Sequence, residues 1–463
     1  MALPKPIGRQ MDVVYLAGAG HNVVLGTAGS GKTSMAILRA AVLSDRQVSG
    51  GGPTLLITFN KTLGTYIRFL AKDVIDRVTV ENFHLFARGY LNARGLMSGG
   101  AIAGTLQHRS LVGKARLQLL ATKPTEPIVL RPASFFEDEF KWMAQHGIRT
   151  LPQYEASERI GRAGARVTRL QKPIVWEVYE AYRQLRTNSG HRYNNDDIAL
   201  AVIDAFAADQ SLRKYKHVVI DEGQDLSPTM LQALAKAIPV DGSLTLFGDV
   251  AQQIYGHRLS WRAAGLHPPK IWMFEENYRN SKAIAELALA ISRMPYYAEA
   301  ADLVTPRQPS ADGPKPTLVA FSDETRETQF VIDRALASRG RSVAILTRTD
   351  QQAERIAARL TGPVQKLEGS MRSWTGGPGI SVGNLHNGKG LEFDVVLLPY
   401  LSAARFPHPR AIEVDGIEDA TAADGRLLYV GVTRARSELI ITHTGDITPL
   451  LPSDVQLFTR ATR

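Results

Sequence analysis

GTAGSGKT, at residues Gly26–Thr33, matches the glycine-rich pattern of a phosphate-binding loop. The short, mostly apolar run Asn22–Leu25 before it predicts a buried strand, and Met35–Val42 after it predicts a helix. Strand, glycine loop and helix in this order are the context that such a loop requires, because the backbone N–H groups at a helix start bind phosphate. The stretch therefore predicts an α/β fold with a nucleotide site in it.

Other apolar runs of strand type alternate with helical or loop sequence along most of the chain. We expect these strands at 54–58, 77–80, 217–220, 244–247, 342–346, 379–382, 395–398 and 439–442. Such alternation favours parallel, doubly wound sheets flanked by helices. Residues 89–195 differ, because they are rich in Arg, Ala, Gln and Leu at helical spacing. We expect two α/β lobes and a mostly helical insertion.

Composition excludes several classes of protein. Hydrophobic residues make up 44% of the 463 residues and charged residues 22%, which is typical of globular domains and not of disordered or fibrous chains. No apolar run approaches the ~18 residues of a membrane span, and no signal peptide is expected at the start. The absence of cysteine excludes disulfides, thiolate metal sites and Cys nucleophiles, and fits a reducing cytoplasm. The net charge of +10 is compatible with a polyanionic partner.

The glycine loop and a second motif together predict nucleotide hydrolysis. Lys32 is expected to reach the β and γ phosphate oxygens and Thr33 to ligate Mg²⁺. The run Val218–Glu222 ends a strand with two acids, of which Asp221 is expected to hold Mg²⁺ through water and Glu222 to orient and deprotonate the attacking water. The alternatives are an ordinary glycine turn and a pair of acids on the surface.

Five further patterns follow in a fixed order. They lie at 221–225 (DEGQD), 247–255 (FGDVAQQIY), 276–280 (ENYRN), 384–393 (NLHNGKGLEF) and 427–436 (LLYVGVTRAR). Each is weak alone, but the ordered set resembles the superfamily 1A DNA helicases of the UvrD/Rep/PcrA type, from Gln10 to about Ile441. The resemblance implies two RecA-like P-loop motor domains that use ATP and Mg²⁺.

The resemblance also implies roles at the nucleotide site. Gln10 is expected to read the adenine edge, Tyr278 to stack on adenine, and Glu392 to contact the ribose. Catalytic roles are implied for Lys32 and Glu222, for Gln252 as the γ-phosphate sensor, and for Arg279 and Arg434 as arginine fingers from the second lobe. The loop residues expected around the phosphates are Gly26, Ala28, Gly29, Ser30, Gly31, Lys32, Thr33 and Ser34.

Three groups of residues are expected to contact DNA. They are Thr58, Phe59, Asn60 and Lys61; Thr79, Phe83 and His84; and Tyr255, His257 and His386. Core packing is the alternative for Phe59 and Phe83, and a structural role is the alternative for His386. A basic series at 159, 162, 166, 169 and 172 recurs at helical spacing and predicts either a solvated face or a track along phosphates.

The resemblance divides the chain into three domains. Motor domain 1A is expected at 1–88 and 196–275, the helical domain 1B at 89–195, and motor domain 2A at 276–463. Relatives usually insert a further domain, 2B, near 350–378. Only about thirty residues separate the strands at 342–348 and 379–382 here, so we expect 2B to be reduced or absent.

The resemblance thus implies an ATP-dependent 3′–5′ single-stranded DNA translocase or helicase, which we expect in the bacterial cytoplasm in association with the nucleoid. Its expected partners are single-stranded or 3′-tailed DNA and a nuclease, repair or defence protein. The alternative is a DNA-stimulated ATPase or sensor subunit of such a complex, without unwinding of its own. A kinase or GTPase is disfavoured, because Arg279, Glu392 and Arg434 would have no purpose in one. DNA rather than RNA rests on the resemblance alone.

Overall fold

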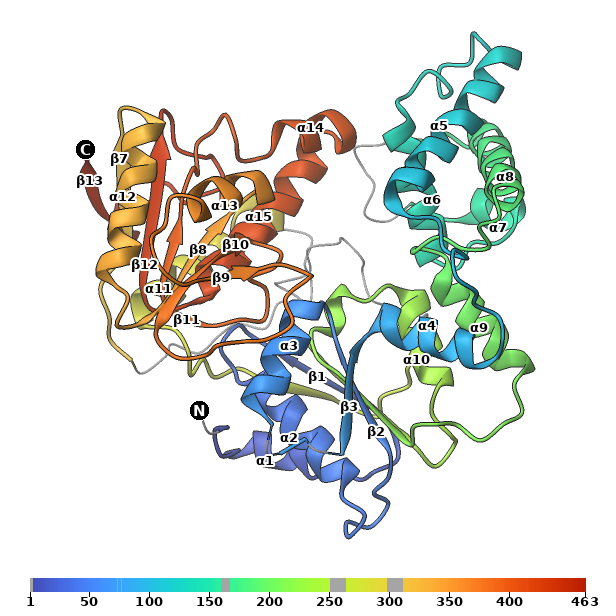
Figure 1. Ribbon diagram of the computed structural model, residues 1–463, viewed down its shortest axis with the longest axis horizontal. Helices are drawn as coiled ribbons and strands as arrows, with labels where there is room; N and C mark the ends of the chain where they lie inside the picture. The colour runs from blue at the N-terminus through green and yellow to red at the C-terminus, as the bar shows by residue number, and fades with distance from the viewer. Residues whose placement is uncertain (1–2, 73, 76, 160–166, 250–263, 298–310) are drawn as a thin grey trace.

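The computed structural model consists of two parallel β-sheets flanked by helices, with a separate group of helices beside them (Figure 1). It describes residues 3–72, 74–75, 77–159, 167–249, 264–297 and 311–463. No helix in these described ranges is long and apolar enough to cross a membrane. The two sheets define two lobes, here called lobe one and lobe two, and both are RecA-like in architecture.

Lobe one is built on a six-stranded sheet in the order β3-β2-β4-β5-β1-β6. Its strands are β1 (Gly20–Gly26), β2 (Thr54–Thr58), β3 (Val78–Asn82), β4 (His217–Ile220), β5 (Ser243–Gly248) and β6 (Ile271–Phe274). Its helices are α1 (Arg9–Val14), α2 (Lys32–Ser44), α3 (Lys61–Leu70), α4 (Phe83–Ala93), α9 (Ile198–Ala208) and α10 (Pro228–Lys236). Along β1, Val23 and Leu25 pack into one hydrophobic cluster and Val24 into another, so the sheet is buried on both faces.

Lobe two is built on a seven-stranded sheet in the order β13-β7-β12-β11-β8-β10-β9. Its strands are β7 (Thr317–Phe321), β8 (Ser342–Thr347), β9 (Val364–Leu367), β10 (Gly379–Asn384), β11 (Phe393–Leu398), β12 (Ala435–Thr444) and β13 (Thr459–Thr462). Its helices are α11 (Lys282–Ser292), α12 (Glu324–Ala337), α13 (Asp350–Ala357), α14 (Pro409–Asp415) and α15 (Ile417–Thr433). The strands pair in parallel, which places their carboxyl ends at one edge of the sheet.

The insertion forms the helical group at the upper right of Figure 1. Its helices are α5 (Thr105–Thr122), α6 (Ala133–Gln145), α7 (Leu151–Ala156) and α8 (Lys172–Asn188), and they pack around a hydrophobic cluster of their own. The basic series expected here does not form one exposed helical face. Arg159 pairs with the buried carboxylate of Glu139, and Lys172 donates to the carbonyls of Tyr154, Glu155 and Ser157. Both charges therefore hold this helical group together, while 162 and 166 lie outside the described residues.

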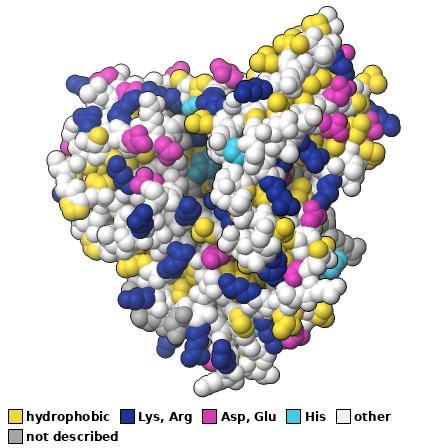
Figure 2. Space-filling view, turned by 45° about the vertical axis from the view of Figure 1, so that its right-hand side comes forward, with side chains coloured by type: hydrophobic (Ala, Val, Ile, Leu, Met, Phe, Trp, Pro, Cys, Tyr) yellow, Lys and Arg dark blue, Asp and Glu magenta, His cyan; other side chains and the backbone are white. Residues whose placement is uncertain are grey.

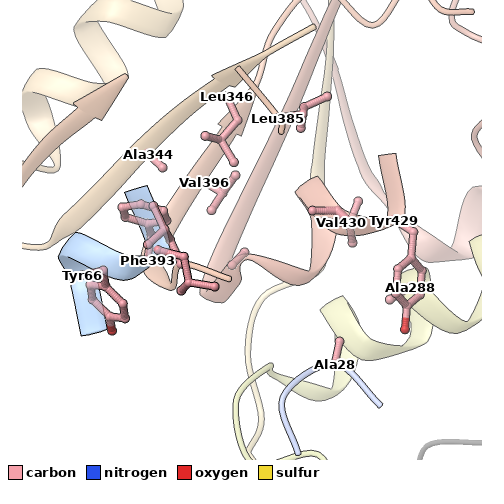
Figure 3. Close-up of a cluster of buried hydrophobic side chains, with 14 of the residues drawn as sticks. Ala28, Tyr66, Ala288, Ala344, Leu346, Leu385, Phe393, Val396, Tyr429 and Val430 are labelled. Atoms are coloured by element: carbon pink, nitrogen blue, oxygen red, sulfur yellow. The ribbon is translucent and has the colours of Figure 1, made fainter. Parts of the chain in front are cut away.

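The two lobes share one hydrophobic cluster (Figure 3). Ala28 of the glycine loop and Tyr66 of α3 belong to lobe one, and Phe393 and Val430 belong to lobe two, yet all four side chains are members of this cluster. A continuous apolar contact between the lobes transmits a displacement of one to the other, because packed interiors resist deformation. The two lobes thus pack directly against each other around the glycine loop.

Residues 368–378 connect β9 to β10 and cross from lobe two onto α3 of lobe one. The hydroxyls of Thr62 and Thr65 donate to the carbonyls of Glu368 and Met371, at 3.2 and 3.3 Å. Trp374 packs edge-on against Tyr66, with ring centroids 5.2 Å apart. This short segment is where the sequence predicts a reduced or absent domain 2B.

Candidate nucleotide site and nucleic-acid groove

The glycine loop lies between the carboxyl end of β1 and the first turn of α2. Lys32 is buried, and its ammonium donates to the carbonyls of Gly26 and Thr27 at 2.8 and 2.6 Å. The same ammonium pairs with Asp249 Oδ2 at 3.4 Å. Gly29 has a φ of 79°, and a Cβ there would come within 2.1 Å of Asn277 Oδ1, so only glycine fits. The loop is therefore tightly packed against the segment that carries Tyr278 and Arg279.

Two acids follow β4 at the same edge of the sheet. Asp221 is buried, and neither of its carboxylate oxygens has a hydrogen-bond partner among the described residues. Burial, and then the charge of Glu222, raise the pKa of Asp221 to about 7, although the nearby Thr33 hydroxyl and Lys32 oppose the rise. A carboxylate buried beside the Thr33 hydroxyl offers oxygen ligands that fit a cation. Asp221 and Thr33 are therefore suited to hold Mg²⁺.

Glu222 has a backbone φ of 55°, which is rare outside glycine. Burial alone would raise the pKa of Glu222, but the charges of Lys389, Lys32 and Arg434 together lower it. Gln224 donates to one of its carboxylate oxygens. Glu222 is thus ionised at neutral pH and held in one orientation, as a general base must be.

A cavity of about 310 Å³ opens beside the glycine loop. It is lined by Ile7, Gly8, Arg9, Gln10, Ser30, Met273, Phe274, Glu275, Glu276 and Tyr278. Gln10 Nε2 donates to the carbonyl of Ser30 at 3.1 Å, and the Tyr278 ring is 56% exposed. The cavity thus combines an amide, which can read the edge of a base, with an aromatic face on which a base can stack.

Four charged residues of lobe two, Arg279, Glu392, Arg434 and Arg436, lie near this site. Glu392 pairs with Arg279 and with Arg436, the latter at 2.8 Å, and these charges outweigh burial and lower the pKa of Glu392 to about 2. Arg434 is buried, and its guanidinium donates to the carbonyls of Val430 and Leu391. Burial, and then the charge of Arg279, lower the pKa of Arg434 to about 10, so it remains protonated. Arg279 and Arg434 are both held by lobe two. The charge of Arg279 acts on Lys32, and the charge of Arg434 acts on Glu222.

A buried ion pair joins the lobes next to this site. Lys389, which follows β10, lies 2.6 Å from Asp225 Oδ2, and both side chains are fully buried. Asp225 sits in the short helical turn Gly223–Asp225 after Glu222. Burial raises the pKa of Asp225 to about 7, and Lys389 opposes that rise. The sequence patterns contain both residues, but nothing in their spacing predicts that they meet.

Replacing Lys389 with Met is expected to destabilise the protein by about 3–5 kcal/mol, because it leaves the Asp225 carboxylate buried without its partner. The loss should be larger at pH 8.5 than at pH 6. A raised pKa stabilises the protonated carboxyl, so the cost of the unpaired group appears as pH rises through the folded pKa. Urea unfolding at the two pH values measures this, and the double variant with Asp225→Asn should recover most of the loss. An equal loss at both pH values would contradict this assignment.

The expected DNA-contact residues meet where lobe one faces lobe two. Asn60 caps α3 by accepting from the Leu63 N–H, and its Nδ2 donates to the carbonyl of His386 at 3.5 Å. Lys61 is exposed, and the Phe59 ring lies 5.7 Å from the Lys389 ammonium. Figure 2 shows a groove between the lobe on the left and the remainder of the molecule, with histidine and basic side chains along it. The structure thus brings Phe59, Asn60, Lys61 and His386 to one place.

The other residues predicted to contact DNA differ in how exposed their side chains are. Thr58 is buried and its hydroxyl donates to the Asn60 carbonyl, while Thr79 and His84 are half-buried. Burial lowers the pKa of His84 and lowers that of His386 to about 4, so both rings are neutral at pH 7. Phe83 is only 2% exposed and packs in the core of lobe one, which favours the core alternative, and contact of its ring with DNA stays a prediction.

Three residues with predicted roles, Gln252, Tyr255 and His257, lie outside the described residues. Asp249 lies in one of the sequence patterns but received no predicted role, although it is the carboxylate that pairs with Lys32. Its place directly after β5, next to β1 in the sheet, is the signal that could have identified it, because residues after neighbouring parallel strands meet at one edge.

Two family models match this chain. Residues 9–267 match the model of the UvrD/REP helicase N-terminal domain, and residues 365–445 match that of the UvrD-like helicase C-terminal domain. The chain is 32% identical over 194 residues to the mitochondrial ATP-dependent DNA helicase HMI1 of Saccharomyces cerevisiae, covering 37% of this chain and 27% of that protein. It is 26% identical over 295 residues to the ATP-dependent DNA helicase srs2 of Schizosaccharomyces pombe, covering 58% of this chain and 33% of that protein.

The chain therefore spans about a third or less of the length of these curated relatives. The solved C-terminal domain of a protein titled a possible DNA helicase, from Lactobacillus plantarum, overlaps 40% of this chain and 98% of that domain, at 22% identity and a TM-score of 0.29. The N-terminal family model alone covers more than half of the chain. The protein belongs to the UvrD/REP helicase family.

Proposed function

We propose that this protein is an ATP-dependent motor that moves 3′ to 5′ along single-stranded DNA and unwinds duplexes. One observation carries the proposal: the hydrolytic groups Lys32, Asp221 and Glu222 come from lobe one, and arginines of lobe two face them across the interface. Charge delivered from a second lobe stabilises phosphoryl transfer only while the lobes are closed. Hydrolysis and lobe movement are thereby coupled.

Each lobe contributes distinct steps. Gln10 and Tyr278 bind the adenine in the cavity beside the loop, and Lys32 binds the phosphates. Thr33 and Asp221 would hold Mg²⁺, which would supply charge to neutralise the phosphate oxygens. Glu222 orients the attacking water and accepts its proton. Arg279 and Arg434 bind the transferring phosphoryl group, and release of Arg279 from Glu392 leaves that carboxylate for the ribose.

Movement along DNA follows from the position of the groove. Asn60 and His386 belong to different lobes and are hydrogen-bonded to each other across the groove. A movement of one lobe relative to the other at the nucleotide site therefore also changes the width of the groove. Exposed Lys61 is placed to bind a backbone phosphate, and the partly exposed Phe59 ring is placed to stack on a base. Such contacts do not distinguish one base from another, as is required of a protein that moves along DNA of any sequence. The names of the relatives, ATP-dependent DNA helicases, support DNA as the track.

Unwinding polarity tests the finer part of the proposal. We expect the purified chain with ATP to separate a duplex that carries a 3′ single-stranded tail, and to leave a 5′-tailed or blunt duplex intact. A gel-based strand-separation assay with the three substrates measures this, with Lys32→Ala as the inactive control. Preference for the 5′ tail would refute the direction. ATP hydrolysis on the 3′-tailed substrate without strand separation would instead favour the sensor subunit of a larger complex.

A further inference from the structure

Arg39 is a fully buried arginine on α2, and the nucleotide chemistry described above does not use it. It lies seven residues after Lys32, two turns along the same helix and therefore on the same side. Burial lowers the pKa of Arg39 to about 10, and no charged group among the described residues contributes to that shift. The guanidinium remains protonated at neutral pH without a paired carboxylate, which is a costly arrangement unless its hydrogen bonds are satisfied.

The two terminal amino groups of Arg39 donate to the end of α1 and to the segment after it, while its Nε–H has no hydrogen-bond partner among the described residues. Its guanidinium donates to the carbonyls of Val14 at 3.2 Å, Ala17 at 2.9 Å, and Leu16. These carbonyls belong to the last turn of α1 and to the segment after it, where backbone oxygens have no partner within the helix. A cation is also favourable there, because the carboxyl end of a helix carries partial negative charge. Arg39 thus fixes the end of α1 to α2.

Besides Arg39, α1 is attached through Val13 and Val14, which are buried in the cluster that the lobes share, and through Gln10. The Gln10 amide donates to Ser30 of the glycine loop and accepts from the Ile7 N–H at 3.3 Å. The six-residue helix α1 is too short to be stable alone, so its position depends on such contacts. One end of α1 is therefore bound to the loop and the other to Arg39, and both anchors sit on the loop–α2 unit that holds the phosphates.

We propose that Arg39 is a positioning residue for base recognition, which holds α1 so that the Gln10 amide stays at a fixed distance from the phosphate-binding loop. Arg39 does not touch the nucleotide in this account. It acts through Gln10, and the inference rests on the proposed use of ATP. Loss of Arg39 weakens the part of nucleotide affinity that depends on the adenine, and leaves the part that depends on the phosphates.

A double-mutant cycle in nucleotide binding tests this. We expect Arg39→Met to raise the Kd of ATP about tenfold, the loss of roughly one well-placed hydrogen bond, and to change the Kd of GTP little. Gln10→Ala should give the same pattern, and the double variant should be no worse than Gln10→Ala alone. Arg39→Lys keeps a cation near the carbonyls and should restore part of the ATP preference. Arg46→Met, an exposed arginine just beyond the same helix, is the matched control.

A second measurement distinguishes a local loss of α1 attachment from general destabilisation of the protein. Amide hydrogen exchange should rise in residues 9–17 of Arg39→Lys, and remain at the wild-type level in β1 and the first turns of α2. Additive losses in the double variant, an equal loss of ATP and GTP affinity, or unchanged exchange in 9–17 would each overturn the inference. If the wild-type chain binds no ATP, the proposed function fails, and the exchange experiment still decides whether Arg39 holds α1.

Discussion

Glu222→Gln is expected to lower kcat for ATP hydrolysis by about 10²–10⁴-fold, the range that a positioned general base contributes. The positive charges around Glu222 keep it ionised, and its amide replacement has nearly the same shape but cannot accept the proton of the attacking water. Binding should survive, since Lys32 and the glycine loop are unaltered. The variant is therefore predicted to bind ATP with nearly wild-type Kd and to hydrolyse almost none of it.

Steady-state phosphate release together with equilibrium binding of ATP measures both quantities. Glu418→Gln makes the same chemical change at an exposed carboxyl in the first turn of α15, and should leave both values at the wild-type level. A kcat of Glu222→Gln within about tenfold of wild type would show that another group activates the water.

Arg279→Ala is expected to lower DNA-stimulated kcat by about 10³-fold, the lower end of the range for an arginine finger. In this structure Arg279 pairs with Glu392, and the Asn277 side chain accepts from its backbone N–H at 3.0 Å. Asn280 anchors the same segment by donating to the carbonyls of Thr433 and Ala435. The guanidinium is therefore held by lobe two, ready to bind the phosphoryl group on closure.

The matched control is Arg341→Ala, which removes an arginine of lobe two that pairs with Glu438 and is 40% exposed. Hydrolysis assays with saturating ATP separate kcat from affinity, because a residue that acts in the transition state lowers kcat and kcat/KM alike. Arg279→Lys should remain far below wild type, since an ammonium lacks the planar fork of donors. A rise in KM with unchanged kcat would instead assign Arg279 to ground-state binding.

Much of the fold could be predicted from apolar runs. The strands at 54–58, 217–220 and 395–398 were predicted because they are buried on both faces and read as continuous hydrophobic segments. The strands β6, β7, β9 and β13 were missed. Of these, β6, β9 and β13 lie at sheet edges, and most of their residues are partly or wholly exposed, so β9 and β13 do not read as continuous hydrophobic segments. β13 illustrates this, as all four of its residues are exposed.

The nucleotide site was predictable where motif residues follow strands in sequence. Lys32, Thr33, Asp221 and Glu222 fall in this class, and the structure places them together. The pair Asp225–Lys389 and the contact of Arg39 with α1 were not predictable, because they join segments far apart in sequence and depend on how helices and lobes pack. The core position of Phe83 could not be decided from the sequence, because an aromatic residue at the start of a helix can either pack in a core or stack on a base.

The central claim is that ATP hydrolysis is coupled to DNA, and steady-state hydrolysis with and without a single-stranded DNA oligonucleotide tests it most directly. We predict strong stimulation by DNA, abolished in Lys32→Ala, which loses the ammonium that binds the phosphates. A parallel reaction with an RNA oligonucleotide of the same sequence distinguishes the two nucleic acids. Intact basal hydrolysis that neither DNA nor RNA stimulates would contradict the account of this chain as an autonomous nucleic-acid motor.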